Sequence, residues 1–197
     1  MDTSTPPPID PSDLPGPKRS WNRTIGGIAL IFGILGLLGA LIAPVSLTFT
    51  KIMMKTFEEQ GADSADVADY IEKLSSLSMM STIGLAILGI MLAVGGIFLM
   101  KTKRLGSPLL KIWAVLKIVF GIFVNYKNYG LTQQQMKIQT SVGGMDPTAA
   151  EMTESITNIA VLVGMIFGTL WVIALPVFLL IWLNRSKIRT DISTWES

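Results

Sequence analysis

The chain has 197 residues, of which 50% are hydrophobic and only 15% charged, and its formal net charge is +2. A water-soluble domain needs about 25% charged residues to cover its surface, so this composition excludes an ordinary soluble domain. The sequence contains no cysteine and no histidine, which excludes disulfides, thiol nucleophiles, zinc sites built on these residues and histidine ligation of haem. Without these ligands, we expect no cofactor. A net charge of +2 is too small to favour nucleic acid, so we expect no nucleic-acid partner either.

Residues 1–22 are predicted to form a disordered, proline-rich cytoplasmic tail. Six of the ten prolines lie in the first 20 residues. Proline fixes the backbone and lacks an N–H donor, so such a segment forms neither a helix nor a core. A plain linker and a ligand for a polyproline-binding partner are the two interpretations of this tail.

Four segments are long and apolar enough to cross a bilayer, which takes about 20 residues of helix. Three of them contain no charged residue: 24–50, 74–100 and 155–184. The fourth, 105–126, carries Lys111 and Lys117, and it is assigned as a span because an even number returns both tails to the same side. The sequence therefore predicts an all-α membrane protein with a four-helix transmembrane domain over residues 23–184. The spans are expected at about 24–46, 78–100, 108–127 and 157–183.

The segments outside the membrane, 50–77 and 128–155, are predicted to be helical as well. In the first, apolar residues recur at every fourth position up to Gly61, which is a favourable residue just after a helix. Ser64 is expected to cap the next helix, and Asp146 to cap the last one. The predicted fold is therefore two long antiparallel helical hairpins.

The distribution of basic residues predicts the orientation, because Lys and Arg of short loops remain on the cytoplasmic side. The two tails and the middle loop hold nine of them: Lys18, Arg19, Arg23, Lys101, Lys103, Arg104, Arg185, Lys187 and Arg189. The two outer segments hold five: Lys51, Lys55, Lys73, Lys127 and Lys137. We therefore expect a multi-pass protein of the plasma or inner membrane with both termini cytoplasmic. Its basic inner rim is expected to contact membrane lipids with anionic headgroups.

Residues 185–197 are predicted to form a basic amphipathic cytoplasmic tail. Ile188, Ile192 and Trp195 fall at positions i, i+4 and i+7, which places them on one face of a helix. A basic helix with one apolar face is expected to lie on the membrane surface.

Small residues mark the faces through which helices pack in lipid, because they allow backbones to approach closely. The first two spans carry such residues at alternating steps of three and four, and the predicted contact uses Gly33, Gly36, Ala40, Ala86, Gly89 and Ala93. The fourth span contains Gly164 and Gly168 in a Gly-x-x-x-Gly pattern. This pair serves either packing within the bundle or contact with a second copy of the protein.

Lys117 is the candidate functional residue inside the membrane. A lysine at the bilayer centre costs about 2.5–3.5 kcal/mol on insertion scales, so it should face the bundle interior or a wet cavity. There it would bind an anionic ligand, a proton or a lipid headgroup. Alternatively, the third span begins later and Lys117 extends to the inner surface. No Asp or Glu lies in any span to pair with it, which leaves neutral partners such as Thr169 or Asn158.

The sequence contains no catalytic motif: it lacks a P-loop, a G-x-S-x-G elbow and the ligand spacing of an EF-hand. It therefore favours a non-enzymatic scaffold or accessory subunit that binds protein or lipid partners, either as a homo-oligomer or with another membrane protein. The alternative is a small transporter or channel subunit in which Lys117 lines the pathway. A dry, closed bundle would favour the first function, and a polar cavity that reaches Lys117 would favour the second.

Overall fold

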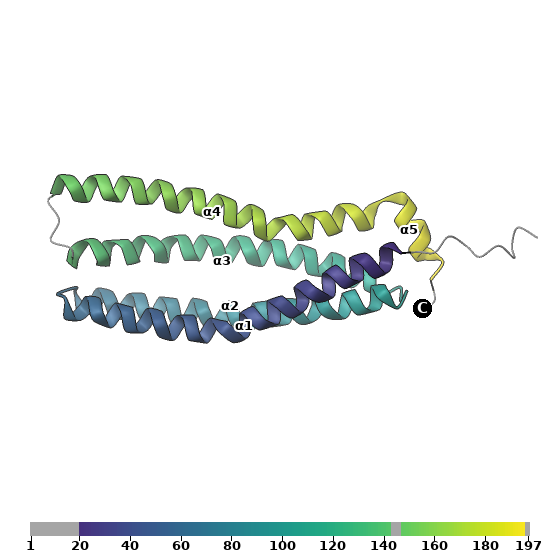
Figure 1. Cartoon of the computed structure of the whole chain (residues 1–197), viewed down its shortest axis with the longest axis horizontal. Coiled ribbons are helices and arrows are strands. Elements are labelled where there is room, and N and C mark those ends of the chain that lie inside the picture. The colour runs from purple at the N-terminus through teal and green to yellow at the C-terminus, as the bar shows by residue number, and fades with distance from the viewer. Residues whose placement is uncertain (1–19, 143–146, 196–197) are drawn as a thin grey trace, which may run out of the picture.

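The structure, a computed structural model, describes residues 20–142 and 147–195, and it is entirely helical apart from short turns (Figure 1). The helices are α1 Trp21–Glu59, α2 Ser64–Met100, α3 Gly106–Val142, α4 Pro147–Asn184 and α5 Ser186–Ser193. α1, α2, α3 and the Asn158–Asn184 part of α4 are each long and apolar enough to cross a membrane. The all-α class and the four candidate spans are thus confirmed. The disordered tail was predicted for residues 1–22. Residues 1–19 and the expected cap Asp146 lie outside the described residues, whereas Trp21 and Asn22 belong to α1.

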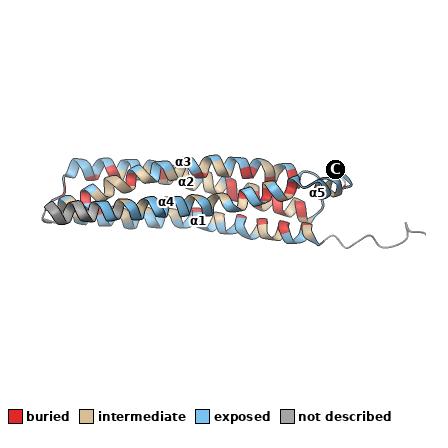
Figure 2. Cartoon of the chain, turned by 90° about the horizontal axis from the view of Figure 1, so that it is seen from above, coloured by how far each residue is buried: buried red, intermediate tan, exposed pale blue. Residues whose placement is uncertain are grey.

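The four long helices run antiparallel and pack in chain order, α1 against α2, α2 against α3, and α3 against α4 (Figures 1 and 2). Each continues without interruption from its apolar part into the more polar segment beyond. At 1.5 Å of rise per residue, α1, which has 39 residues, is about 58 Å long, nearly twice the thickness of a bilayer core. The molecule is therefore a rod whose helices extend beyond the apolar spans.

The turn between α1 and α2 is set by Gly61 and Asp63. Gly61 has a φ of +106°, a backbone conformation that residues with a Cβ atom rarely adopt. The N–H of Ala62 reaches back to the carbonyl of Phe57 at 3.0 Å and thereby satisfies an end carbonyl of α1. The carboxylate of Asp63 accepts the N–H of Ala65 at 2.8 Å. Asp63 is therefore the cap of α2, one residue before the expected Ser64, because its side chain meets the free N–H groups of the first turn.

Two prolines lie inside long helices, Pro44 in α1 and Pro176 in α4. Proline has no N–H and its ring crowds the carbonyl four residues earlier, so it kinks a helix. α1 and α4 both bend partway along their length (Figure 1). The hydroxyl of Thr48 donates to the carbonyl of Pro44 at 3.0 Å, which adds a local contact beside the first bend.

Burial is concentrated in two clusters at opposite ends of the rod (Figure 2). We call the end that holds Trp21 and α5 the termini end, and the end with the Gly61 turn the far end. The termini-end cluster joins all the described helices: Ile25, Ala29, Leu88, Leu92, Leu99, Leu110, Trp113, Ala114, Leu179, Leu183, Ile188 and Trp195. The far-end cluster joins α1, α2 and α3: Met54, Ala62, Val67, Tyr70, Leu77, Leu131 and Ile138. Many large apolar side chains between the clusters are exposed on the outside of the rod, which suits a surface that faces lipid.

Candidate functional site

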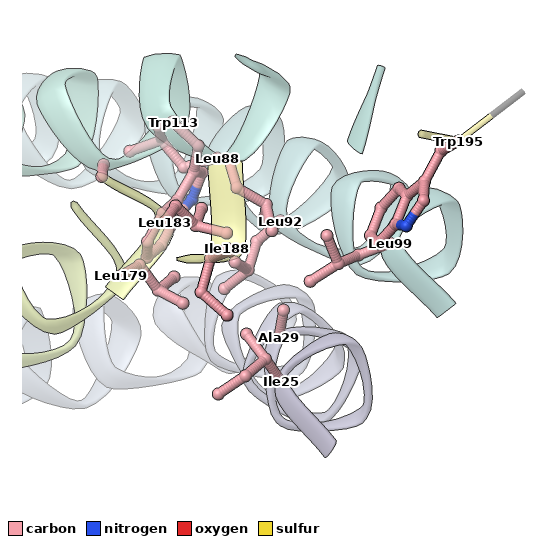
Figure 3. Packing of buried hydrophobic residues seen from close by; sticks show 12 residues of the cluster. Ile25, Ala29, Leu88, Leu92, Leu99, Trp113, Leu179, Leu183, Ile188 and Trp195 are labelled. Carbon is pink, nitrogen blue, oxygen red and sulfur yellow. The ribbon is translucent and has the colours of Figure 1, made fainter. Parts of the chain in front are cut away.

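At the termini end, α5 folds back and covers the ends of the long helices. The side chains of Ile188 and Trp195 are only 8% and 3% exposed. Figure 3 shows Trp195 beside Leu99, and Ile188 between α1 and α4 near Leu183. The expectation that this apolar face lies on the membrane surface therefore differs from the structure: the face packs onto the protein itself. The physical reason is that the open end of the bundle offers an apolar surface directly beside the short Arg185 linker.

Three contacts fix α5 and the two residues that follow it, a unit that we call the clasp. The indole of Trp21 stacks on Trp195 with ring centroids 5.6 Å apart and an interplanar angle of 21°. The Nε1–H of Trp21 donates to the Oδ2 of Asp191 at 2.8 Å. An Nη2–H of Arg104, in the turn between α2 and α3, donates to the carbonyl of Ser193 at 2.6 Å. The clasp therefore joins the start of α1, the α2–α3 turn and the C-terminal segment.

Beside the clasp lies a cavity of about 330 Å³ that we call the basic cleft. Its lining residues are Arg104, Ser107, Pro108, Lys111, Arg189, Ile192 and Ser193. Three of these are cations from three separate elements, and no carboxylate is among them. The ammonium of Lys111 also donates to the Oδ1 of Asn184 at 2.8 Å, and among the described residues it forms no ion pair. Such an arrangement can bind an anionic group such as a phosphate.

Two further basic residues of the expected inner rim behave differently. The guanidinium of Arg185 lies over the ring of Trp182, 4.8 Å from its centroid, in a cation–π contact. Lys187 is exposed on α5 and does not line the basic cleft. The sequence thus indicated the basic end of the molecule, and the fold selects which of its cations converge.

Lys117 is the twelfth of the 37 residues of α3, about a third of the way along the helix, and its side chain is half-buried. It is about 9 Å of helix beyond Lys111. Among the described residues, no hydrogen bond or ion pair involves its ammonium group. The hydroxyl of Thr169, one of the neutral partners expected for it, instead accepts the Nδ2–H of Asn125 at 3.0 Å. The basic cleft does not include Lys117 in its lining.

The predicted small-residue contact between α1 and α2 has its closest approach at Gly33. A Cβ built there would lie 2.7 Å from the backbone nitrogen of Ala93 and 2.9 Å from the carbonyl oxygen of Gly89. A Cβ at Gly89 would lie 3.0 Å from the carbonyl oxygen of Gly33, so the contact is reciprocal. Gly36 is looser, because its nearest neighbour would be the Cα of Gly89 at 3.7 Å. Nearer the termini end, a Cβ at Gly26 would lie 2.6 Å from the carbonyl oxygen of Gly96, and a Cβ at Gly96 would lie 2.6 Å from that of Gly26.

The other small residues of the prediction differ in their surroundings. Ala40 is buried in α1, and Ala86 is half-buried in α2. Gly164 and Gly168 are exposed on α4, and a Cβ at either would meet no atom within 4 Å. The structure therefore gives this pair no packing partner in the described part of the chain.

The contact between α2 and α3 at the far end is polar and was not predicted. The Oδ2 of Asp69 accepts from the ammonium of Lys73 at 2.6 Å and from the Nε2–H of Gln134 at 2.7 Å. These bonds, with Lys73 first, hold the pKa of Asp69 below its ordinary 3.8. Nearby, the hydroxyl of Tyr70 donates to the Oε1 of Gln135 at 3.2 Å, and burial raises the pKa of Tyr70. The i, i+4 spacing of Asp69 and Lys73 was the only local signal of this contact.

No protein family, curated protein or solved structure matches the chain. Within residues 20–142 and 147–195, no group of three or more Asp and Glu side chains is placed to hold a metal ion. The clearest convergence of functional side chains at the termini end is therefore the basic cleft, and the clasp positions one of its walls.

Proposed function

We propose that this protein is a non-enzymatic scaffold or accessory subunit of the plasma or inner membrane that binds anionic lipid headgroups in the basic cleft. The observation that carries the proposal is the convergence of Arg104, Lys111 and Arg189 on one cavity without a carboxylate. The basic excess at the termini end supports an orientation with both termini cytoplasmic. In that orientation the basic cleft faces the leaflet that carries anionic lipids.

A scaffold role is supported by the rigidity of the parts that hold the basic cleft. Backbone contact between α1 and α2 leaves little room for the two helices to move, and the clasp fixes the cleft wall through Arg104 and Ser193. The proposed partner surface is the outer face of α4. There Phe167 and Trp171 are 69% and 80% exposed, on the same half of the helix as Gly164 and Gly168. A second copy of the chain or another membrane protein would pack on this surface through the two glycines.

Lipid binding to the purified full-length protein in mild detergent tests the proposal. Native mass spectrometry with added phosphatidylglycerol, which is anionic, should show tighter retention than with phosphatidylcholine. Arg189→Gln should weaken phosphatidylglycerol binding about fivefold, because a basic residue near an anionic surface contributes about 1 kcal/mol. Lys187→Gln removes the same charge from α5 outside the basic cleft, and it should leave binding unchanged. Equal retention of the two lipids, or equal effects of the two variants, would contradict the proposal.

A disulfide test addresses the partner surface, since the chain contains no native cysteine. Gly168→Cys should form a disulfide-linked dimer in native membranes if a second copy packs on this face. Gly39→Cys, which is equally open on α1, should not form one. The absence of a cross-linked dimer from Gly168→Cys under oxidising conditions would leave only a different membrane protein as the partner.

A small transporter or channel subunit is the second candidate function. One observation favours it: Lys117 is half-buried within the apolar part of α3, and within the described part of the chain its ammonium has no hydrogen-bond or ion-pair partner. A charge that is retained in an apolar span without a partner is typical of a residue that lines a pathway.

A further inference from the structure

A larger cavity of about 640 Å³ lies between α2 and α3 toward the far end. We call it the far-end cavity. Its lining residues are Glu72, Lys73, Ser76, Leu77, Met80, Phe123, Lys127, Gly130, Leu131 and Gln134. None of them lines the basic cleft, and all belong to two helices that are held together by the Asp69 contacts. The far-end cavity is therefore a separate feature at the opposite end of the rod.

The lining of the far-end cavity changes from polar to apolar along the helix axis. On α2 the polar part spans residues 72–76, and the apolar part follows with Leu77 and Met80. On α3, which runs antiparallel, Gln134 lies beside the polar part and Phe123 beside the apolar part, with Leu131, Gly130 and Lys127 between them. From residue 72 to Met80 the helix rises about 12 Å. The uncharged run of α2 begins at residue 74, so the cavity straddles the point where the apolar span begins.

Three charged side chains line this cavity, and one of them is already paired. Lys73 is paired with Asp69 at 2.6 Å, and Gln134 donates to the same carboxylate. Within the described residues, neither Glu72 nor Lys127 has an ion-pair partner. The ammonium of Lys127 makes a cation–π contact with Phe123, 5.9 Å from the ring centroid, which places it close to the apolar part of the lining. The far-end cavity therefore offers one carboxylate and one ammonium group beside an apolar wall.

We propose that the far-end cavity binds a zwitterionic phospholipid whose headgroup carries a primary ammonium. Its phosphate binds the ammonium of Lys127, and its amine donates hydrogen bonds to the carboxylate of Glu72. The first acyl carbons lie against Leu77, Met80 and Phe123. The order of these groups in such a lipid matches the order of the lining along the helix axis. A phospholipid without a cationic headgroup would leave Glu72 unpaired beside a phosphate, which disfavours it.

This site goes beyond the proposed binding of anionic lipid at the termini end, and it does not depend on which side of the membrane is cytoplasmic. It predicts only that the bound lipid belongs to the leaflet opposite the termini. Variants of the basic cleft such as Arg189→Gln should leave it unaffected.

A cavity-filling variant tests occupancy by native mass spectrometry of the full-length protein with added phosphatidylethanolamine. Gly130 lines the far-end cavity, and a Cβ there would meet no atom within 4 Å, so Gly130→Leu adds a side chain at the cavity wall without displacing a helix. Leucine is also the better helix former. Gly39→Leu is the matched control, because Gly39 is equally open but lies on α1. Gly130→Leu should lose at least about tenfold in affinity while Gly39→Leu binds as the parent does. Equal binding by the two variants would overturn the site.

A charge variant tests the headgroup assignment. The parent should bind phosphatidylethanolamine more tightly than phosphatidylglycerol at this site. Glu72→Gln should lower the phosphatidylethanolamine affinity about tenfold and leave that of phosphatidylglycerol unchanged or raised, because it removes a charge-assisted hydrogen bond. Glu58→Gln, an exposed position on α1 outside the cavity, should change neither. If Glu72→Gln leaves the ratio of the phosphatidylethanolamine and phosphatidylglycerol affinities unchanged, the carboxylate of Glu72 does not distinguish the two headgroups, which would contradict the assignment.

Discussion

Gly33→Ala tests the close backbone contact between α1 and α2. The added Cβ would lie 2.7 Å from the backbone nitrogen of Ala93, 2.9 Å from its Cβ and 2.9 Å from the carbonyl oxygen of Gly89. Nonbonded carbon atoms in ordinary contact are about 3.5–4.0 Å apart. Two of these neighbours are backbone atoms that cannot rotate away, so the helices must separate locally by about 1 Å.

The expected cost follows from comparison with two other glycines of the same helix. A Cβ at Gly39 meets no atom within 4 Å, and a Cβ at Gly36 is in ordinary contact at 3.7 Å. Replacing glycine by alanine favours a helix by up to about 1 kcal/mol at each position, and this gain cancels in the comparison. Overpacking costs about 1–3 kcal/mol. The free energy of unfolding of Gly33→Ala should therefore lie about 1–3 kcal/mol below that of Gly39→Ala, with Gly36→Ala close to Gly39→Ala.

The measurement is reversible unfolding in mixed micelles with increasing dodecyl sulfate, followed by tryptophan fluorescence and circular dichroism. Each variant is compared with the parent under the same detergent composition. Equal free energies of unfolding for Gly33→Ala and Gly39→Ala would refute the conclusion that backbone contact holds this helix pair.

Four further predictions concern other parts of the molecule. Trp195→Ala should release the clasp at a local cost of about 3–5 kcal/mol, seen as faster tryptic cleavage within α5 while the long helices stay protected. Lys117→Leu should leave thermal stability in detergent equal or higher, because it removes an insertion cost of about 2.5–3.5 kcal/mol. If this variant loses a transport phenotype while its fold is intact, the pathway role of Lys117 is established. A cysteine at Ser75 should react with an impermeant thiol reagent from outside the cell and one at Thr102 should not, whereas the reverse pattern would invert the orientation. Asp69 has a folded-state pKa below 3.8, so its contribution to the α2–α3 contact is present above pH 3.8 and is lost as the pH falls through the lowered value. Amide exchange at the far end should rise in that acid range, and Asp69→Asn should remove the pH dependence.

The features that could be predicted from the sequence are those with local causes. The absence of charge over about 27 residues is enough to indicate a span, because the cost of a buried charge acts on each residue separately. Gly61 ends α1 as expected, since the backbone conformation needed there is specific to glycine. The spacing of Gly33 and Gly89 likewise indicated a close helix contact, and the structure places them against each other.

The partners of each face could not be predicted, because periodicity identifies a face and not what covers it. Gly33 and Gly164 both belong to small-residue patterns, but among the described residues Gly33 contacts another helix and Gly164 does not. The sequence indicated that α5 has an apolar face, but not that this face packs on the open end of the bundle. That packing involves the hydrogen bond from Trp21 to Asp191, which are 170 residues apart in the chain. The basic cleft, where three cations converge, depends on the register between helices, which no local pattern specifies. The same holds for the far-end cavity.

The clasp has a consequence for the order of synthesis. The indole of Trp21 leaves the ribosome 170 residues before the carboxylate of Asp191 that accepts its hydrogen bond. At about 5–20 residues per second, this interval is roughly 10–30 seconds. During that time the aromatic and aliphatic surface at the start of α1 has no cover from α5 and is open to insertion factors, chaperones and proteases. The termini end is thus the last region to mature, and a nascent chain that stalls before α5 displays an unsealed apolar end by which a quality-control system can recognise it.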